Sequence, residues 1–189
     1  MPQSADQMKT LLEGFHSFGA PEGFRVELIE GEIVVTPPGD GDHEKGLSRV
    51  ARQVIKRSGT EMDVSATKGL RLTGDGTTPD DHVIPDATFA PVELDVFSGA
   101  EPWMPGEGVA LVLDITPGRR SSDRTTARRR CYARAGIPLH LSIARDAAQV
   151  TLFNAPGAND YLEHWTRPFG REIPLPDPFA FDLDTSDLL

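Results

Sequence analysis

Apolar residues recur with two different periods along the first third of the chain. Helical spacing of apolar residues predicts two helices, and alternation on either side of Glu30-Gly31 predicts a β-hairpin between them. Asp42 has a side chain suited to capping the second helix. The predicted elements are a helix over 5–18, strands over 24–29 and 32–36, and an amphipathic helix over 43–57.

The rest of the chain is patterned mainly as strands, interrupted by one helix. Residues 108–116 are almost continuously aliphatic, which predicts a strand buried on both faces. Residues 82–90 predict a single strand with Pro85 at its entry. A helix is predicted from Ser122 to Ala135, where a glycine and a proline follow. Further strands are predicted over 61–65, 68–72, 139–144, 150–153 and 161–165.

This order of elements predicts the α/β class, with a mixed central β-sheet flanked by helices and an N-terminal β-hairpin. The chain of 189 residues fits one domain, with a helix in residues 1–20 and an extended tail in residues 170–189. No G-x-G-x-x-G follows a predicted strand, and the sequence has no P-loop. A dinucleotide-binding fold is therefore not expected.

The composition narrows the class of protein further. A single cysteine, Cys131, excludes an internal disulfide framework and a cysteine-based zinc finger. The N-terminus lacks the basic and then apolar order of a signal peptide. The longest aliphatic run, 109–113, is far shorter than the ~20 residues that span a bilayer. We therefore expect a soluble, cytoplasmic protein that does not enter a membrane.

Charge is distributed unevenly along the chain. The formal net charge of −10 argues against a general nucleic-acid coat. Residues 119–134 nevertheless hold seven arginines and one acid, a local balance of +6 that leaves −16 on the remainder. Two interpretations are open: a local site for an anion, or a solvated helix face whose arginines pair with surrounding acids.

Two aspartates stand out by their apolar surroundings. Asp86 follows Pro85 inside a predicted strand, and Asp114 lies near the end of the most hydrophobic strand. A carboxylate in such a place is costly unless it is paired or holds a metal. Each could cap a turn or pair with an arginine. Together, 28 residues apart, they can lie on adjacent strands and meet at one end of the sheet.

A Pro-Asp pair followed by an acid in a hydrophobic strand resembles the PD-(D/E)XK nucleases. The flanking segments RVELIEGEIVVTPP, VIPDATF, VALVLDITP and DRTTARRRCYARAGIPLHLSIA resemble the Uma-type restriction endonuclease family of bacteria. The resemblance covers about residues 20–185 and implies a restriction-endonuclease-like (PD-(D/E)XK) fold for the single domain.

The resemblance also implies a metal-dependent DNA endonuclease. Asp86, Asp114 and the backbone carbonyl of Ile115 would hold Mg²⁺, with Mn²⁺ as an alternative, because Mg²⁺ prefers oxygen ligands and activates a bound water. Counting back four residues from Tyr132, Arg128 stands where the family carries its catalytic lysine. A cation at that position would hold the phosphate and favour hydroxide.

Three further candidates for the catalytic site follow from the resemblance. His43 matches the histidine that opens the first core helix, although it could equally be a helix-terminal surface residue. Glu27 and Glu32 match the hairpin acids, one of which would reach the metal through a water; the alternative is that both face solvent. The candidate contacts to DNA phosphates are Arg120, Arg124 and Arg128.

The sequence departs from the nuclease motif and the family pattern at three positions. Thr116 replaces the lysine of the motif, and Arg128 cannot exchange a proton at neutral pH as a lysine can. Asp114 is one methylene shorter than the usual glutamate. Two functions therefore stay open: a Mg²⁺-dependent endonuclease, and a catalytically impaired nucleic-acid-binding or regulatory module on the same fold.

Other classes of function have less support from the sequence. A dimeric interaction protein could pair the arginine helix with an acidic partner. Separately, a homodimer is possible for the nuclease itself, because related folds often act as dimers. A cysteine hydrolase has the least support, because Cys131 lacks the glycines of a nucleophile elbow and fits a core-filling thiol.

Overall fold

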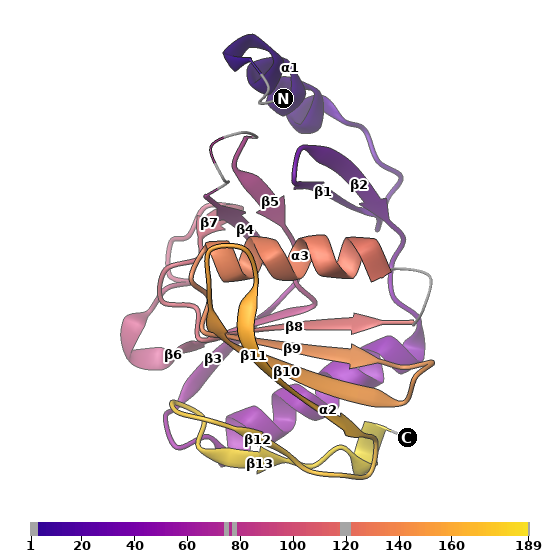
Figure 1. The fold of residues 1–189 in the computed structure, drawn as a ribbon, viewed down its shortest axis with the longest axis vertical. Helices are drawn as coiled ribbons and strands as arrows, with labels where there is room; N and C mark the ends of the chain where they lie inside the picture. Colours follow the sequence, from indigo (N-terminus) through magenta and orange to yellow (C-terminus); the bar gives the residue numbers. More distant parts are fainter. Residues whose placement is uncertain (1–3, 74–75, 77–78, 118–121, 189) are drawn as a thin grey trace.

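The computed structural model describes residues 4–73, 76, 79–117 and 122–188. From top to bottom, Figure 1 shows one β-sheet, helix α3, a second β-sheet, and helix α2 beside the C-terminal hairpin. The helical elements are α1 (Ala5–Ser17), α2 (Gly41–Arg57), α3 (Ser122–Arg134) and the 3₁₀ turns η1 (Val92–Leu94) and η3 (Ser186–Leu188).

The larger sheet has six strands in the order β11-β10-β9-β8-β6-β3. Strands β8 and β9 are parallel, and the other neighbours are antiparallel, so the predicted mixed sheet is confirmed. Its strands are β3 (Met62–Ala66), β6 (Ala87–Pro91), β8 (Leu111–Thr116), β9 (Leu139–Ala144), β10 (Gln149–Pro156) and β11 (Tyr161–Pro168).

Strand β8 is covered on both faces, as its aliphatic sequence predicts. Leu113 belongs to a core that includes Val54 of α2. Val112 belongs to a second core that includes Tyr132 of α3. Because side chains alternate along a strand, Asp114 points to the same side as Val112, toward α3.

The smaller sheet has five strands in the order β2-β1-β5-β4-β7 and carries the predicted hairpin. Its strands are β1 (Arg25–Ile29), β2 (Glu32–Thr36), β4 (Gly69–Leu72), β5 (Asp81–Val83) and β7 (Trp103–Pro105). Glu30 and Gly31 both have positive φ, 49° and 81°, as a tight two-residue hairpin turn requires. Ile29 and Val34 share the core that contains Tyr132, so α3 is held between the two sheets.

The segment predicted as one strand over 82–90 is two strands in different sheets. Strand β5 ends at Val83 in the smaller sheet, and β6 starts at Ala87 in the larger one. Pro85 lies in the break and has no backbone N–H to donate to a ladder. The backbone N–H of Asp86 instead donates to the Leu113 carbonyl at 2.9 Å. Asp86 therefore lies where the chain crosses between the sheets.

Helix α2 starts two residues before its predicted beginning, and its cap differs. Asp40, rather than Asp42, is the N-cap, because Oδ1 of Asp40 accepts the backbone N–H of His43 at 2.8 Å. This cap fixes the first turn of α2, in which His43 is buried.

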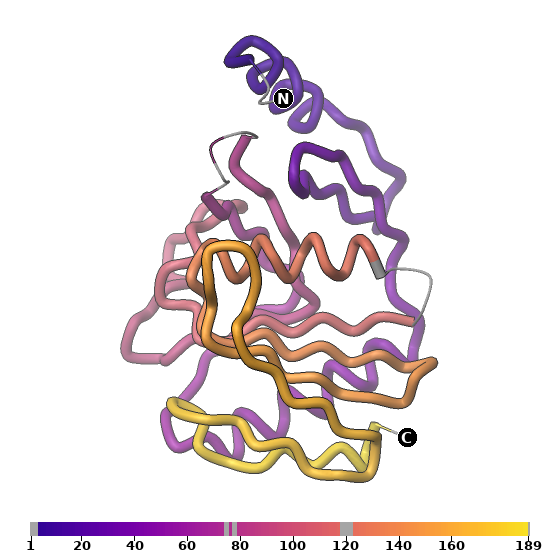
Figure 2. The backbone as a smooth tube through the Cα atoms, viewed as in Figure 1, coloured from indigo at the N-terminus to yellow at the C-terminus, as the bar shows by residue number. Residues whose placement is uncertain are grey.

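The C-terminal segment is folded rather than extended. Strands β12 (Ile173–Leu175) and β13 (Phe181–Leu183) form an antiparallel hairpin, which Figure 2 shows as a yellow loop beside α2. Phe179 and Leu183 are buried in the core that α2 covers. The segment predicted as an extended tail over 170–189 thus contains two short strands, and its apolar side chains join the core on the α2 side of the larger sheet.

Among the described residues, no helix combines the length and the apolar character needed to cross a membrane.

Candidate functional site

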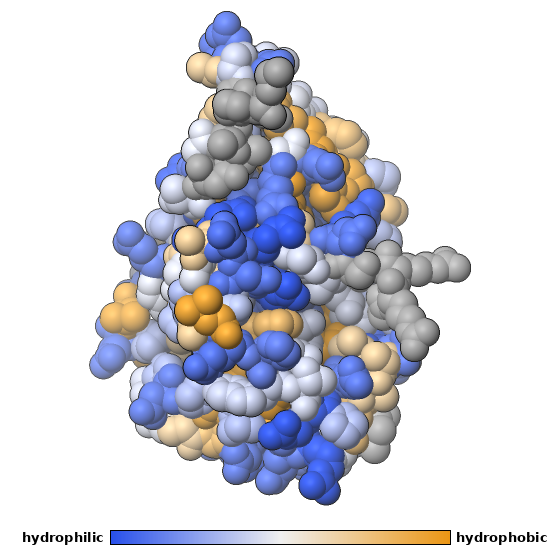
Figure 3. All heavy atoms as spheres, in the orientation of Figure 1, coloured by the Kyte–Doolittle hydropathy of each residue, from blue (hydrophilic) through white to orange (hydrophobic). Residues whose placement is uncertain are grey.

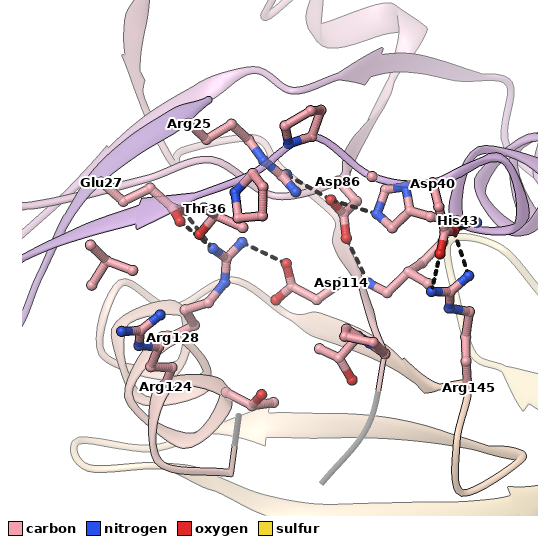
Figure 4. Close-up of a pocket in the computed structure, with 18 of the residues that line it drawn as sticks. Arg25, Glu27, Thr36, Asp40, His43, Asp86, Asp114, Arg124, Arg128 and Arg145 are labelled. Atoms are coloured by element: carbon pink, nitrogen blue, oxygen red, sulfur yellow. Dashed lines mark hydrogen bonds and ion pairs between the residues drawn. The ribbon is translucent and has the colours of Figure 1, made fainter. Parts of the chain in front are cut away.

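A pocket of about 360 Å³ opens between the hairpin, the start of α2, the end of β8 and the start of α3. Figure 4 shows charged side chains from all four places turned toward one another across it. Such a volume is in the range of small-ligand sites. Its principal charged side chains are Arg25, Glu27, Asp40, His43, Asp86, Asp114, Arg124, Arg128 and Arg145.

Asp86 is held on both of its oxygens. Oδ1 lies 2.6 Å from Arg25 Nη1 and 3.0 Å from His43 Nε2, and Oδ2 accepts the backbone N–H of Ile115 at 2.6 Å. Burial alone would raise the pKa of Asp86, but contact with His43 and the charge of Arg25 outweigh burial and lower it. Asp86 is thus a charged acid fixed beside the residue that follows Asp114.

Asp114 is also buried and ionised. Its Oδ1 accepts from Arg128 Nη2 at 2.7 Å, and its Oδ2 lies 3.1 Å from His140 Nε2. The Tyr132 hydroxyl donates to Oδ1 at 3.4 Å. Burial opposes the charge, yet the charge of Arg128 and the contact with His140 lower the pKa of Asp114 well below its ordinary value.

Glu27, on β1, is the third acid of the pocket and has no exposed surface. Nη1 of Arg128 lies 2.6 and 2.7 Å from its two oxygens, and the backbone N–H of Ile84 donates to Oε1 at 2.6 Å. Burial raises the pKa of Glu27, and the charge of Arg128 only partly offsets that effect.

Arg128 joins two of the three acids. One guanidinium nitrogen binds Glu27, and the other binds Asp114 and the Ile84 carbonyl at 2.9 Å. In Figure 4 its planar head lies between the two carboxylates. We call this arrangement of Glu27, Arg128 and Asp114 the Arg128 bridge.

His43 links the start of α2 to the acids. Its Nε2 faces Asp86, and its Nδ1 lies 3.1 Å from Glu44 Oε1. The contact with Asp86 raises the pKa of His43 above its ordinary value, against the effect of burial. The imidazole at this position therefore helps to hold Asp86 ionised.

The rim of the pocket carries two arginines of different character. Arg145 is paired with the N-cap Asp40, with Nη–Oδ distances of 2.6 and 2.8 Å. Arg124, one turn before Arg128 on α3, is exposed and has no ion-pair partner among the residues that the structure describes. Arg124 is therefore available to an anion that enters the pocket.

The structure brings most of the predicted site residues to this one pocket. Seven of them line it: Glu27, His43, Asp86, Asp114, Ile115, Arg124 and Arg128. Glu32 does not, because it is exposed at the turn end of the hairpin and lines a neighbouring hollow with Arg130. Glu27 is the hairpin acid that reaches the pocket. Arg120 lies outside the described residues.

The other arginines of α3 behave as the surface interpretation expects. Arg129 binds Asp160 through two nitrogens at 2.7 and 2.6 Å. Arg130 and Arg134 both bind Glu30, and Arg134 also contacts Asp81 at 3.0 Å. Figure 3 shows the hydrophilic residues gathered over α3 on this face. Of the five arginines of α3, four are thus paired with acids of the surrounding structure.

Sequence reasoning missed Arg25, Arg145 and His140 as members of the charged network. A signal existed for His140, which is a polar residue inside the apolar strand β9 and is fully buried. Arg25 and Glu27 are two residues apart on β1, so both could have been placed on the same face of the hairpin. For Arg145, the partner Asp40 lies 105 residues away, and the pairing has no local signal.

The three acids offer the hard oxygen donors that Mg²⁺ prefers. Their oxygens, however, already face Arg25, Arg128, His43, His140 or a backbone N–H. No cluster of three or more His, Cys, Asp or Glu within 4–73, 76, 79–117 and 122–188 has the arrangement of a metal site. The residues as they lie therefore do not fit a divalent cation.

Comparison with known proteins agrees with the fold predicted from the sequence. A solved structure described as “a putative nuclease belonging to DUF820 from Anabaena variabilis ATCC 29413” is similar, with a TM-score of 0.70 and 19% identity over 94% of this chain and 96% of that chain. The fold is restriction-endonuclease-like. No curated protein matches the chain. The model of the Uma2 family, described as “Putative restriction endonuclease”, matches residues 12–186, and the chain belongs to that family.

Proposed function

We propose that this chain is a DNA endonuclease that holds the phosphodiester backbone in the pocket between Arg124 and the three buried acids. Membership of the Uma2 family supports the general class of activity. The observation that carries the proposal is convergence: Glu27, Asp86 and Asp114 come from a hairpin, a chain crossing and a central strand, and all three line one open pocket.

The energetics of burial favour a functional reason for this cluster. A buried ion pair is weak evidence for stability, because well-packed apolar residues in its place are often equally stable or more so, by about 1–4 kcal/mol. Perturbed acids gathered in a cleft are typical of functional sites. The three buried acids at the base of an open pocket are therefore better explained by binding of a ligand than by a contribution to folding.

Arg124 supplies the contact to phosphate that the geometry supports best. It is exposed at the mouth, and residues four apart on a helix share a face, so Arg124 and Arg128 line the same wall. Arginine binds phosphate oxygens in a bidentate manner. Arg25 and Arg145 are already paired with Asp86 and Asp40, and their role is to hold those acids in place.

Mg²⁺ is the cofactor that we propose, on the basis of the family and the oxygen chemistry of Glu27, Asp86 and Asp114. These acids can hold the ion only if the cationic side chains that face them move away.

A second function is favoured by the Arg128 bridge itself. If Arg128 permanently neutralises Glu27 and Asp114, the pocket binds DNA without cleaving it. The two functions make different predictions for the same experiment.

The test is conversion of supercoiled plasmid to nicked or linear DNA in the presence of Mg²⁺ or Mn²⁺. We expect the wild-type protein to nick the plasmid and Asp86→Asn to lose that activity. Asp160→Asn is the matched control, since Asp160 is also paired with an α3 arginine but lies outside the pocket. Retarded plasmid without nicking would favour the second function, and absence of both would contradict the proposal.

A further inference from the structure

Most carboxylate oxygens of Glu27, Asp86 and Asp114 already have partners, and this has a consequence for any divalent cation that enters the pocket. Both oxygens of Glu27 and Oδ1 of Asp114 face the guanidinium of Arg128 at 2.6–2.7 Å. Asp86 is engaged by Arg25, His43 and a backbone N–H. Oδ2 of Asp114 makes no hydrogen bond in the part of the chain described, although His140 lies 3.1 Å from it.

The acids of the cluster already face cationic side chains. Three carboxylates face two arginines, Arg25 and Arg128, and the His43 ring lies beside Asp86. A divalent cation added to this set would create a surplus of positive charge within a few ångströms, where like charges repel strongly. One cationic side chain must therefore leave when such an ion binds.

Arg128 is the side chain whose place the ion would take. It alone contacts two of the acids, with Nη1 on Glu27 and Nη2 on Asp114, so the centre of its guanidinium lies between their oxygens. Arg25 contacts only Asp86 among the acids, and His140 contacts only Asp114. Arg128 also lines the pocket, with its side chain 15% exposed, so the open volume of the pocket lies beside it.

We propose that Arg128 and a divalent cation are alternative occupants of the position between Glu27 and Asp114, so that the Arg128 bridge keeps the unliganded protein from binding the metal. This inference rests on the proposed function, since a DNA phosphate offers Arg128 the bidentate acceptor that it gives up when it leaves the two acids. Metal binding and DNA binding then support each other, because each favours the same position of Arg128.

The test measures Mn²⁺ binding by its effect on the melting temperature, without DNA. Mn²⁺ in about tenfold excess over its Kd raises the melting temperature of a protein of this size by about 3–5 °C. We expect almost no shift for the wild-type protein and a clear rise for Arg128→Met, whose melting temperature without metal is lowered because Glu27 and Asp114 lose their shared arginine. Arg130→Met is the matched control, because Arg130 pairs a neighbouring hairpin acid outside the pocket, and it should behave as wild type.

Arg128→Lys keeps the test decisive if Arg128→Met does not fold. A lysine retains one charge but cannot bridge two carboxylates in a planar fork, so we expect a shift between those of wild type and Arg128→Met. Adding Asp114→Asn to Arg128→Lys should remove the shift. The inference is overturned if the wild-type protein shifts as much as the Arg128 variants, or if neither Arg128 variant shifts.

A DNA arm separates this inference from the proposed function. A short duplex with phosphorothioate linkages, which resist cleavage, should raise the Mn²⁺ affinity of the wild-type protein. If Mn²⁺ shifts the Arg128 variants but the duplex changes nothing in wild type, the metal competition stands and the proposed action on DNA fails.

Discussion

Two pairs of a hairpin acid and an α3 arginine lie close together and differ in every respect that matters for function. Glu27 with Arg128 is buried, with side chains 1% and 15% exposed. Glu30 with Arg130 is at the surface, with side chains 27% and 38% exposed. The first pair includes a third partner, Asp114, and lines the pocket, whereas the second pair includes Arg134 and does not.

The difference comes from helix geometry and not from residue type. Arg128 and Arg130 are two positions apart on α3, so they project to well-separated directions around the helix. The Arg128 side chain projects into the space between the two sheets, where it meets Glu27 and Asp114. The Arg130 side chain projects toward the exposed hairpin turn, where it meets Glu30. A glutamate–arginine pair is thus part of a buried site in one place and a surface contact in the other. Mutations of the two pairs should therefore have different effects on stability.

The largest effect should follow from Arg128→Met. Removing one partner of a buried ion pair leaves uncompensated charge and costs about 3–5 kcal/mol of unfolding free energy, which urea denaturation measures. The double variant with Glu27→Gln should recover part of the loss, since it removes one of the two acids that are left without their arginine. A loss below about 1 kcal/mol for Arg128→Met would show that the buried pair is no different from the surface pair.

A much smaller effect is expected for Arg130→Met. An exposed pair contributes about 0–1 kcal/mol, and Arg134 stays bound to Glu30 in the variant. A double-mutant cycle over Glu30 and Arg130, compared with one over Glu27 and Arg128, isolates the two interaction energies. Equal coupling in the two cycles would contradict the comparison.

The smallest effect concerns acid stability. The hydrogen bond from Arg130 lowers the pKa of Glu30 below its ordinary value of 4.5. A depressed carboxyl pKa stabilises the folded protein above the ordinary value, and this contribution is lost as the pH falls through the lowered value. Glu30→Gln should therefore flatten the decline of the unfolding free energy below pH 4.5, measured by urea titration at several pH values. An unchanged slope would remove Glu30 from the acid response.

Much of this arrangement could be predicted from the sequence because its signals are local. Asp86 and Asp114 are acids in apolar strands, and the helices and the central strand β8 follow from periodicity. The segment 82–90 is also apolar on both sides of Pro85 and Asp86, so the sequence predicts one strand there. Nothing local shows that the chain changes sheets at Pro85, since the change depends on which distant strands pair.

The pairing of the charges could not be predicted in the same way. Glu27 and Arg128 are 101 residues apart, and their contact depends on α3 lying between the two sheets. Glu27 and Glu32 share a face of the hairpin because Glu27 is paired with Val34, two residues after Glu32. Their separation along the strands, which leaves Glu32 at the turn, decides that only Glu27 reaches the pocket.

The most direct test of the central claim, that this pocket acts on DNA, is the affinity of Arg124→Ala for a labelled duplex. Fluorescence anisotropy at low and moderate salt gives both the Kd and its salt dependence. Loss of one phosphate contact should weaken binding severalfold and lower the salt slope by about 1. Arg52→Ala, which removes an exposed arginine of α2 outside the pocket, should bind as wild type. Equal effects of the two variants, or none from either, would contradict the account.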